Sequence, residues 1–450
     1  MFKIIKNHLY LLQLENYDLP RFLKVVFLRP FPKTKPRQEL VWTPKLIVVF
    51  ILALGFVFSV AWGNLLYYGF RWTGILLSVI YTLAFINLFP LVLVLALLVV
   101  KPFDLVARTM ILTRAKTKLA KVPNLKIIGI TGSYGKTTMK EILATVLSQR
   151  FQVLKTPENI NTPRGVARRI QSELTESTEI FIVEMGAYHR GDIRSFCNLT
   201  RPDIVILTGI NEQHIERFGS LDNIIKAKFE IIENAKGQAL TLLNGENELI
   251  CQNYKKFNVE NKKIVFYSKE SPYPNPLNKR LLGEYASGMI NASVIIGREL
   301  GMSRDEIHRG IENLKPIPHR LELIENPNGV TVIDDSYNGN PDGVDEAIKV
   351  LSKFSNRRKI YITPGLAELA ERSRDIHVKI GEKLSEVADL VILVRNRVTP
   401  FIAEGLKRRD FADNKILWYE TALQAHEDLG NILKSGDVVM FQNDWPDNYI

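Results

Sequence analysis

The stretch GITGSYGKTTMKEIL, residues 129–143, contains residue types that can hold phosphate groups and a divalent cation. Gly132 and Gly135 allow backbone N–H groups to turn toward phosphate oxygens. Lys136 offers an ammonium for the outer phosphates, and the hydroxyl of Thr137 is a typical ligand of Mg²⁺. The start of the following helix adds partial positive charge. The spacing therefore predicts a nucleotide phosphate site, and the alternative is a plain glycine turn in front of a helix.

This loop departs at one position from the common pattern G-x-x-x-x-G-K-[ST], because Ile130 stands where the first glycine is expected. Its form is T-G-x-x-G-K-T-T. The apolar run 125–131 before it favours a buried parallel strand, and 139–151 after it has helical spacing. Strand, glycine loop and helix are the context that such a loop requires. The residues expected to contact the nucleotide are Gly132, Ser133, Tyr134, Gly135, Lys136, Thr137 and Thr138.

Three polar residues after the glycine loop are further candidates for a binding site. Glu184 comes directly after the expected strand 180–183, and ligands collect at the carboxyl edge of a parallel sheet. His214 lies in a loop after a second expected strand, 204–207, although a lone histidine is more often structural. Lys228 lies in the helical stretch KAKFEI, where an unmodified surface lysine is the plain alternative. For Glu184, the alternative is a solvated loop acid.

A second motif begins at residue 330. In VTVIDDSYNGNPDGVDEAIKVL, a β-rich run ends in Asp334 and Asp335, the segment SYNGNP turns the chain, and a helix follows. Shortly before it stands PHRLELI, residues 318–324, which contains Arg320. Taken alone, DDSYNGNP is equally typical of a turn with an Asx cap.

Together, the loop T-G-x-x-G-K-T-T and the motif D-D-S-Y-N-G-N-P resemble the Mur ligase family. The second motif is very similar to the signature of the branch that adds D-alanyl-D-alanine. These ATP-dependent enzymes build the peptide stem of the bacterial cell wall. The resemblance covers residue 123 to residue 450. It implies a P-loop ATPase-type central domain over 123–317 and a C-terminal domain over 318–450.

The resemblance also implies roles for individual residues. Lys136 binds the phosphates and takes part in catalysis together with the metal-site residues. Two Mg²⁺ ions are held by Thr137, Glu184, His214 and, if carbamylated, Lys228. On the nucleotide, Arg320 reaches a phosphate, Asp335 contacts the ribose, and Tyr337 and Asn338 lie at the adenine side. The segment ENINTPRGVARRI resembles the acceptor-binding loop, with Asn161, Thr162 and Arg164 as its candidates. A turn and helix cap explain those three residues equally well.

Three features depart from the family pattern. The family's UDP-binding N-terminal domain has no counterpart here. The segment TPGLAEL lacks the acid of the usual Gly-Asp-Met, and FQNDWPDNYI stands where the branch often has Lys-Gly-Ser. The first departure leaves the acceptor's carrier open between UDP and a lipid, and the others leave the incoming amino acid or dipeptide open. We expect His377, in the helical stretch after TPGLAEL, on the surface of its helix.

The elements around these motifs predict an α/β protein. After the second motif, apolar runs in KIYITPG, ADLVILV, KILWYE and GDVVMFQ alternate with helical stretches, as in a Rossmann-like parallel sheet. Before residue 101, the chain contains two uncharged stretches, 46–68 and 72–100, separated by three residues. Each is long enough to cross ~30 Å of hydrocarbon. We therefore expect a transmembrane hairpin over 44–100, and two buried core helices are the alternative.

Charge and cysteine content agree with this organisation. Residues 1–128 contain 17 Lys and Arg against 4 Asp and Glu, a net charge of +13, so the rest of this +11 chain carries −2. That distribution favours a membrane surface over a nucleic acid partner. Basic residues flank both stretches, in 1–43 and 101–122, which predicts that both termini and the catalytic domains lie in the cytoplasm. Two cysteines indicate neither a disulfide framework nor a zinc ribbon, and favour a reducing compartment.

The sequence therefore favours a plasma-membrane ligase of the Mur type. It joins an amino acid or dipeptide to a carboxylate of a UDP- or lipid-linked cell-wall precursor, through an acyl phosphate. Two alternatives stay open: a membrane ligase similar to poly-γ-glutamate synthase, and a non-catalytic ATP-binding scaffold of wall enzymes. Glutamate polymerisation distinguishes the former, and tight ATP binding without hydrolysis distinguishes the latter.

Overall fold

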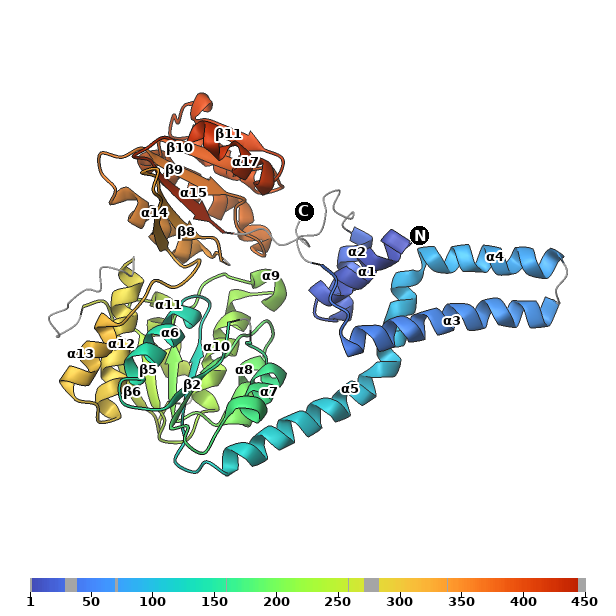
Figure 1. The fold of residues 1–450 in the computed structure, drawn as a ribbon, viewed down its shortest axis with the longest axis horizontal. Helices are drawn as coiled ribbons and strands as arrows, with labels where there is room; N and C mark the ends of the chain where they lie inside the picture. The colour runs from blue at the N-terminus through green and yellow to red at the C-terminus, as the bar shows by residue number, and fades with distance from the viewer. Residues whose placement is uncertain are drawn as a thin grey trace. The chain divides into compact units, whose positions relative to one another are not determined.

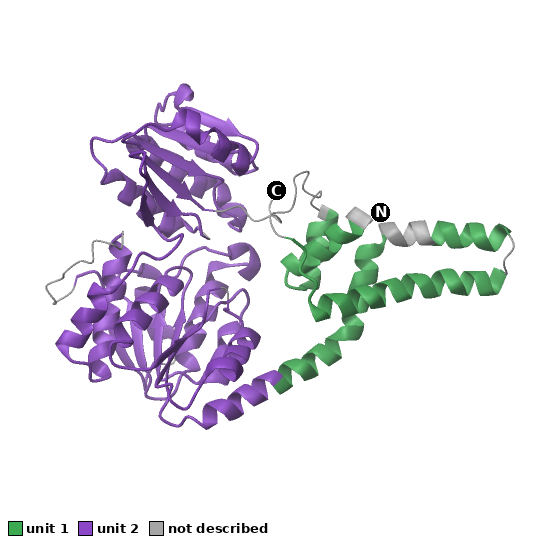
Figure 2. Ribbon diagram, in the orientation of Figure 1, with its two compact units in different colours: residues 1–110, 446–450 green, residues 111–445 purple. Residues whose placement is uncertain are grey.

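The computed structural model describes most of the chain as two compact units, one built on residues 1–110 and the other on residues 111–445 (Figure 2). The described residues are 2–28, 39–68, 72–158, 160–257, 259–270, 283–337 and 339–443.

The first unit is helical. Helices α3 and α4 lie side by side as an antiparallel pair (Figure 1), and the Ser78 hydroxyl of α4 donates a 3.2 Å hydrogen bond to the carbonyl oxygen of Ala61 in α3. Helix α5 leaves the first unit and enters the second. The helices are α1 Phe2–Leu14, α2 Leu19–Leu28, α3 Pro44–Tyr68, α4 Trp72–Asn87 and α5 Phe89–Ala120.

The expected second span, 72–100, differs in the structure. It is divided between α4 and α5, with Leu88 as the turn between them. The reason is Pro90, which has no N–H to donate and whose ring clashes with the carbonyl four residues earlier. Helix α5 then continues through Pro102 to Ala120, so most of the basic flank 101–122 is helical.

Two helices among the described residues are long and apolar enough to cross a membrane. They are α3, with 25 residues, and α5, with 32. Large apolar side chains along α3 are exposed, including Phe58 (66%) and Leu66 (67%), so most of this helix is not covered by the rest of its unit. The amphipathic helices α1 and α2 pack against the first part of α3 and of α5 through Leu9, Phe22, Leu46 and Leu93.

The second unit begins with a central lobe built on a six-stranded sheet of order β2-β3-β1-β4-β5-β6, in which every neighbouring pair is parallel. The predicted strands before the glycine loop, before Glu184 and at 204–207 are β1, β3 and β4. The strands are β1 Lys126–Thr131, β2 Val153–Lys155, β3 Ile180–Glu184, β4 Ile204–Leu207, β5 Leu240–Asn244 and β6 Lys263–Tyr267.

Helices cover both faces of this sheet (Figure 1). One core packs α6, α12 and α13 against one face, and the other packs α7, α8 and α10 together with the end of α5, at Ala115, against the opposite face. The helices are α6 Lys136–Leu147, α7 Pro163–Glu173, α8 Asp192–Thr200, α9 Ile215–Phe218, α10 Leu221–Glu233, α11 Glu248–Asn253, η1 Tyr254–Lys256, α12 Glu284–Glu299 and α13 Arg304–Glu312.

The C-terminal lobe has a second six-stranded sheet, of order β11-β10-β9-β12-β8-β7. Only the edge pair β7–β8 is antiparallel within the described strands. The expected α/β fold with two sheet domains is confirmed. The elements are β7 Glu322–Glu325, β8 Thr331–Asp335, α14 Pro341–Ser352, β9 Lys359–Thr363, η2 Ala370–Arg372, α15 Ser373–Val387, β10 Leu390–Val394, α16 Thr399–Lys407, η3 Asp413–Lys415, β11 Ile416–Tyr419, α17 Ala422–Ile432 and β12 Val438–Gln442.

Two glycines allow α15 and α16 to cross closely. A Cβ at Gly381 would lie 2.1 Å from the carbonyl oxygen of Ile402, and one at Gly405 would lie 2.0 Å from that of Val378. Because the obstructing atoms are backbone, no side-chain movement can relieve them. The close crossing fixes the helix layer that covers one face of the C-terminal sheet.

Candidate active site

The glycine loop joins β1 to α6 with a backbone that requires glycine at two positions. Gly135 is the N-cap of α6 and has a left-handed conformation, with φ 75°. A Cβ at Gly132 would lie 2.1 Å from the Oγ1 of Thr208 on the neighbouring β4 side. The loop is held by a 2.7 Å hydrogen bond from the backbone N–H of Ser133 to the carbonyl oxygen of Gly209. The loop is therefore tight and set at the N-terminus of a helix, as phosphate binding requires.

The Lys136 side chain folds back over this loop. Its ammonium donates to the carbonyl oxygens of Gly132 (2.8 Å) and Ser133 (3.3 Å). Burial lowers the pKa of Lys136 to about 8; the Glu184 carboxylate opposes this shift and the Arg320 guanidinium adds to it. A buried ammonium that donates to neutral carbonyls gains from an anion, so the residues present fit a phosphate group.

Glu184 ends β3 beside the loop. Its carboxylate accepts hydrogen bonds from the Thr137 hydroxyl (3.1 Å to Oε2) and from the fully buried ammonium of Lys140 (3.1 Å). Its backbone N–H donates to the hydroxyl of Thr156 at 3.0 Å. A hydroxyl and a carboxylate in contact are hard oxygen donors, and this pair fits a magnesium ion.

Lys228 and His214 lie within electrostatic range of each other, and Lys228 also within that range of Lys136. Lys228, on α10, is 3% exposed, and the described residues offer its ammonium neither a hydrogen bond nor an ion pair. Burial, followed by the charge of Lys136, lowers the pKa of Lys228 well below its usual range. Burial also lowers the pKa of His214, and the charge of Lys228 adds to that shift. Both shifts are toward the neutral form, which metal binding by imidazole and carbamylation of an amine require.

The two lobes meet over the loop. The guanidinium of Arg320 stacks on the Tyr337 ring at 4.5 Å, and its Nη2 lies 3.5 Å from the Thr137 hydroxyl. The buried Nε of Arg320 has no hydrogen-bond partner among the described residues, so this donor also suits a phosphate oxygen. Burial raises the pKa of Asp335 to about 7, although Arg320 opposes that shift.

A cavity lies beside these residues, between the glycine loop and the C-terminal lobe. Aromatic rings from the central lobe, Tyr134 and Tyr285, approach each other at 5.3 Å on its wall. The cavity lining includes Tyr134, Gly135, Thr138, Tyr285, Met289, Arg320, Asp335, Tyr337, Asn340 and Glu346. An aromatic wall next to a phosphate loop suits a purine base.

Protein-family models match both lobes of the second unit. The Mur ligase middle domain matches residues 130–292, and the glutamate ligase domain of Mur ligases matches residues 319–442. The chain belongs to the Mur ligase family. Its enzyme class is therefore that of ATP-dependent, ADP-forming carbon–nitrogen ligases.

Among relatives of this Mur ligase are two UDP-N-acetylmuramoyl-tripeptide–D-alanyl-D-alanine ligases. That of Bacillus subtilis is 26% identical over 70% of this chain and 72% of its own length, and that of Escherichia coli is 29% identical over 64% and 70%. The crystal structure of the MurF ligase from Thermotoga maritima, in complex with ADP, is similar with a TM-score of 0.64 and 27% identity, covering 75% of this chain and 80% of that chain.

The predicted acceptor loop of this Mur ligase has a visible structural role. The hydroxyl of Thr162 caps α7 by accepting a 3.2 Å hydrogen bond from the backbone N–H of Gly165. Asn161 lies against Gly186, where an added Cβ would be 3.0 Å from the Asn161 carbonyl oxygen. Arg164 is partly buried in the first turn of α7. The segment thus follows the cap interpretation at Thr162, while Asn161 lies against Gly186, two residues after the end of β3 at Glu184.

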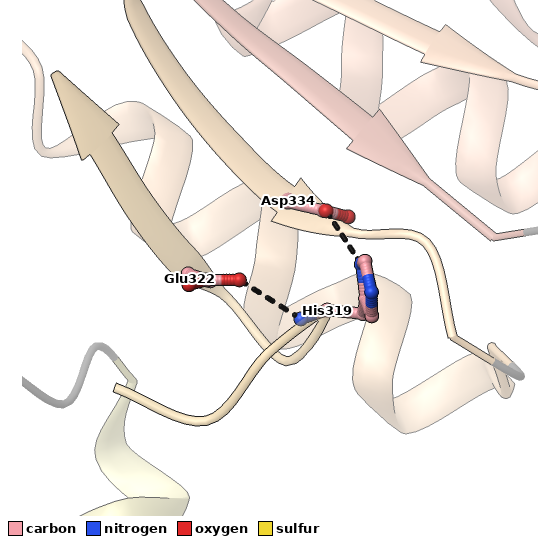
Figure 3. Close-up of side chains that lie close together, drawn as sticks. All are labelled: His319, Glu322 and Asp334. Carbon is pink, nitrogen blue, oxygen red and sulfur yellow. Dashed lines mark hydrogen bonds and ion pairs between the residues drawn. The ribbon is translucent and has the colours of Figure 1, made fainter. Parts of the chain in front are cut away.

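Next to Arg320, His319 closes a small polar cluster (Figure 3). Its Nδ1 contacts Asp334 Oδ2 at 2.7 Å, and its backbone N–H donates to Glu322 Oε2 at 3.2 Å. His319 has a left-handed conformation, with φ 59°. These hydrogen bonds stabilise the turn at His319, and this turn places Arg320 beside the glycine loop. Asn338, expected at the adenine side, lies outside the described residues.

Several residues of the site were not predicted from the sequence. Lys140 pairs with Glu184 from one turn along α6, and its spacing after Lys136 would have placed it on the same helix face. Asn211 donates to Asn340 (2.8 Å) and Asp342 (2.9 Å) across the lobes. Glu368 contacts His214 from the segment TPGLAEL, which lacks the acid of the family's usual Gly-Asp-Met. The last two depend on contacts between distant segments, for which the sequence has no local signal.

Proposed function

We propose that this chain is a membrane-anchored Mur-type ligase that joins an amino acid or dipeptide to a carboxylate of a cell-wall peptide precursor. By likeness to the relatives named above, the incoming group is D-alanyl-D-alanine. The observation that carries the proposal is the buried phosphate loop with Lys136, next to Glu184 and Thr137 and below Arg320 of the other lobe. The lobes correspond to a central domain, 123–317, and a C-terminal domain, 318–450.

The reaction has two steps. An oxygen of the acceptor carboxylate attacks the γ-phosphorus of ATP, the bond to the bridging oxygen breaks, and ADP leaves with its electron pair. The amine of the incoming group then attacks the carbonyl carbon of the acyl phosphate, inorganic phosphate leaves, and the amine loses one proton. Lys136 and Arg320 are placed to stabilise the charge that develops on the transferring phosphoryl group.

Two Mg²⁺ ions fit the donor set of Thr137, Glu184, His214 and a modified Lys228, and they would neutralise phosphate charge when bound. The neutral amine of Lys228 adds to CO₂ to form a carbamate with release of one proton. This converts a buried group, which has no ion-pair partner among the described residues, into a carboxylate-like ligand. In the same arrangement, Asp335 and Tyr337 bind the ribose and adenine, and Asn161 and Arg164 contact the acceptor.

The first unit supports an anchor with both ends in the cytoplasm. The apolar face of α3 is exposed over most of its length, which suits lipid better than water. The Lys45 ammonium, at the start of α3, forms a 3.1 Å ion pair with Asp104 of α5, just after the second apolar stretch. That pair holds the two polar flanks at the same end of the apolar helices. The basic residues around it favour the cytoplasmic side.

The test is phosphate release by the full-length protein in detergent. Reactions contain Mg-ATP and D-Ala-D-Ala, with a UDP-linked or a lipid-linked tripeptide acceptor, and Lys136→Ala is the control. We expect release that requires both acceptor and dipeptide, and that Lys136→Ala abolishes. Absence of release with either acceptor, from protein that still binds ATP, would overturn the proposal. Release with glutamate alone would instead favour a poly-γ-glutamate type of ligase.

A further inference from the structure

A polar contact between the two lobes of the site is made by Glu368, in the loop after β9. Its Oε2 contacts Nδ1 of His214, and its Oε1 accepts a 2.7 Å hydrogen bond from Nε of Arg217. Its carbonyl oxygen also accepts a 3.3 Å bond from the backbone N–H of Glu216. The Glu368 side chain is 8% exposed. Both carboxylate oxygens are therefore occupied by the central lobe.

The surroundings of this contact are closed. The His214 ring meets the Tyr188 ring edge-on at 5.0 Å, and the Arg217 guanidinium lies over the same ring at 4.5 Å. His214 and Glu368 both have φ 63°, a conformation that non-glycine residues seldom adopt. Each of the two loops therefore adopts an unfavourable backbone conformation at the residue that makes the His214–Glu368 contact.

The chemistry of the contact determines which imidazole nitrogen is available. A carboxylate paired with the Arg217 guanidinium only accepts hydrogen bonds, so Nδ1 of His214 is the donor to Oε2 and carries the proton. Nε2 is then the basic nitrogen. A histidine that gives its other N–H to a carboxylate is the usual arrangement around protein-bound metals, where the carboxylate fixes both tautomer and ring orientation.

We propose that Glu368 is a positioning residue, which orients His214 from the opposite lobe so that the second metal position is complete only when the lobes are in contact. This inference rests on the proposed function, because it needs His214 as a metal ligand. It adds that metal binding and lobe closure are coupled through one carboxylate. A ligand set that assembles only on closure prevents ATP from reacting before both substrates are enclosed.

The test measures metal affinity rather than turnover. Mn²⁺ binding to full-length protein in detergent is followed by electron paramagnetic resonance, with a non-hydrolysable ATP analogue present. We expect Glu368→Gln to weaken the second Mn²⁺ site by about 10- to 100-fold. The matched control is Glu212→Gln, because Glu212 forms another interlobe ion pair, with the exposed side chain of Arg372 at 3.6 Å. The Mn²⁺ affinity of the Glu212→Gln variant is expected to equal that of the unsubstituted protein.

A double-mutant cycle separates positioning from general stability. If Glu368 acts through His214, Glu368→Gln causes no further loss of Mn²⁺ affinity in a His214→Ala background. An additive loss, or an unchanged second site in Glu368→Gln, overturns the positioning role. Phosphate release by the unsubstituted protein is measured in the same preparation. If release is present while Glu368→Gln leaves Mn²⁺ binding unchanged, this inference alone fails; if release and the second Mn²⁺ site are both absent, the proposed function fails with it.

Discussion

The ammonium of Lys140, on α6, donates a 3.1 Å hydrogen bond to Oε2 of Glu184 at the end of β3, and the Lys140 side chain is fully buried. Removing one partner of a buried ion pair leaves the other charge without compensation. We expect Lys140→Met to lower the free energy of unfolding by about 3 kcal/mol. Thermal melting of the detergent-solubilised protein measures this as a fall in melting temperature of about 6–12 °C.

The control for that substitution lies nearby. The Lys155 ammonium forms an ion pair with Glu141, also on α6, but its side chain is 40% exposed. Exposed pairs contribute about 0–1 kcal/mol, so Lys155→Met is expected to change the melting temperature little. Equal melting temperatures for the two variants would show that the buried Lys140–Glu184 pair contributes no more to stability than the exposed Lys155–Glu141 pair.

Lys136 predicts a pH dependence of ATP binding. Burial lowers its pKa to about 8, so the ammonium is lost as the pH rises through that value. An uncharged amine no longer attracts the phosphates, and we expect the affinity for ATP to be about five- to tenfold lower at pH 9 than at pH 7. Equilibrium binding of a fluorescent ATP analogue, measured between pH 7 and pH 9.5, checks this.

Lys136→Arg serves as the reference for that titration. A guanidinium stays charged over this pH range, so the pH profile of the variant should be flat even where its overall affinity is lower. A profile for Lys136→Arg that falls in parallel with that of the unsubstituted protein would assign the pH dependence to another group.

The sequence predicted those parts of the site that are local in the chain. The glycine loop is contiguous from Gly132 to Thr138, and Glu184 is the last residue of a strand. Glu368 could not be predicted in the same way, because its contact with His214 joins loops 154 residues apart. His377 was expected on a helix surface but is fully buried, and its Nε2 accepts a 2.9 Å hydrogen bond from Leu366 N–H. Helical spacing identifies faces, but it does not say which loop covers a face.

Asp335 predicts a change of stability with pH. Burial raises its pKa from 3.8 to about 7, so its contribution to stability is present below pH 3.8 and is lost as the pH rises through 7. Asparagine stays neutral and retains the oxygen that accepts the 3.3 Å bond from Leu321 N–H. We expect Asp335→Asn to stabilise the protein at pH 8 by about 2 kcal/mol, and much less at pH 5. Melting temperatures at the two pH values measure the difference.

For the neighbouring Asp334, we expect the opposite change of stability with pH. Burial would raise its pKa, but hydrogen bonds from Ser336 and His319 outweigh burial and lower it. Its contribution is therefore present at neutral pH and is lost as the pH falls through the folded-state pKa. Asp334→Asn should destabilise the protein at pH 8. If both asparagine variants shifted the melting temperature in the same direction at pH 8, the assignment of the two environments would be wrong.

The proposed membrane orientation predicts a labelling pattern. Tyr67, near the end of α3, is 82% exposed, and Lys101 lies on α5 just after the apolar stretch. In a variant with both native cysteines, Cys197 and Cys251, changed to serine, we expect Tyr67→Cys to react with a membrane-impermeant maleimide in intact cells. Lys101→Cys should react only after the cells are permeabilised. Labelling of Lys101→Cys in intact cells would reverse the orientation.

The crossing of α15 and α16 predicts opposite effects for two glycine substitutions. A Cβ at Gly405 would lie 2.0 Å from the Val378 carbonyl oxygen and 2.9 Å from the backbone nitrogen of Glu382. Since these atoms belong to the facing helix backbone, the two helices must separate, and we expect Gly405→Ala to cost about 3 kcal/mol. Gly430, in α17, is exposed and has nothing within 4 Å of its added Cβ. There alanine restricts the unfolded chain and favours the helix, so Gly430→Ala should stabilise by up to about 1 kcal/mol.

Both variants are compared by thermal melting under one set of conditions, so that the detergent contributes equally. The sign of each shift is the decisive readout, because the two substitutions are chemically identical and differ only in what surrounds the new methyl group. A stable Gly405→Ala variant would mean that the two helices are too far apart for an added Cβ at Gly405 to lie 2.0 Å from the Val378 carbonyl oxygen. A destabilised Gly430→Ala variant would mean that a neighbour covers α17 at that position.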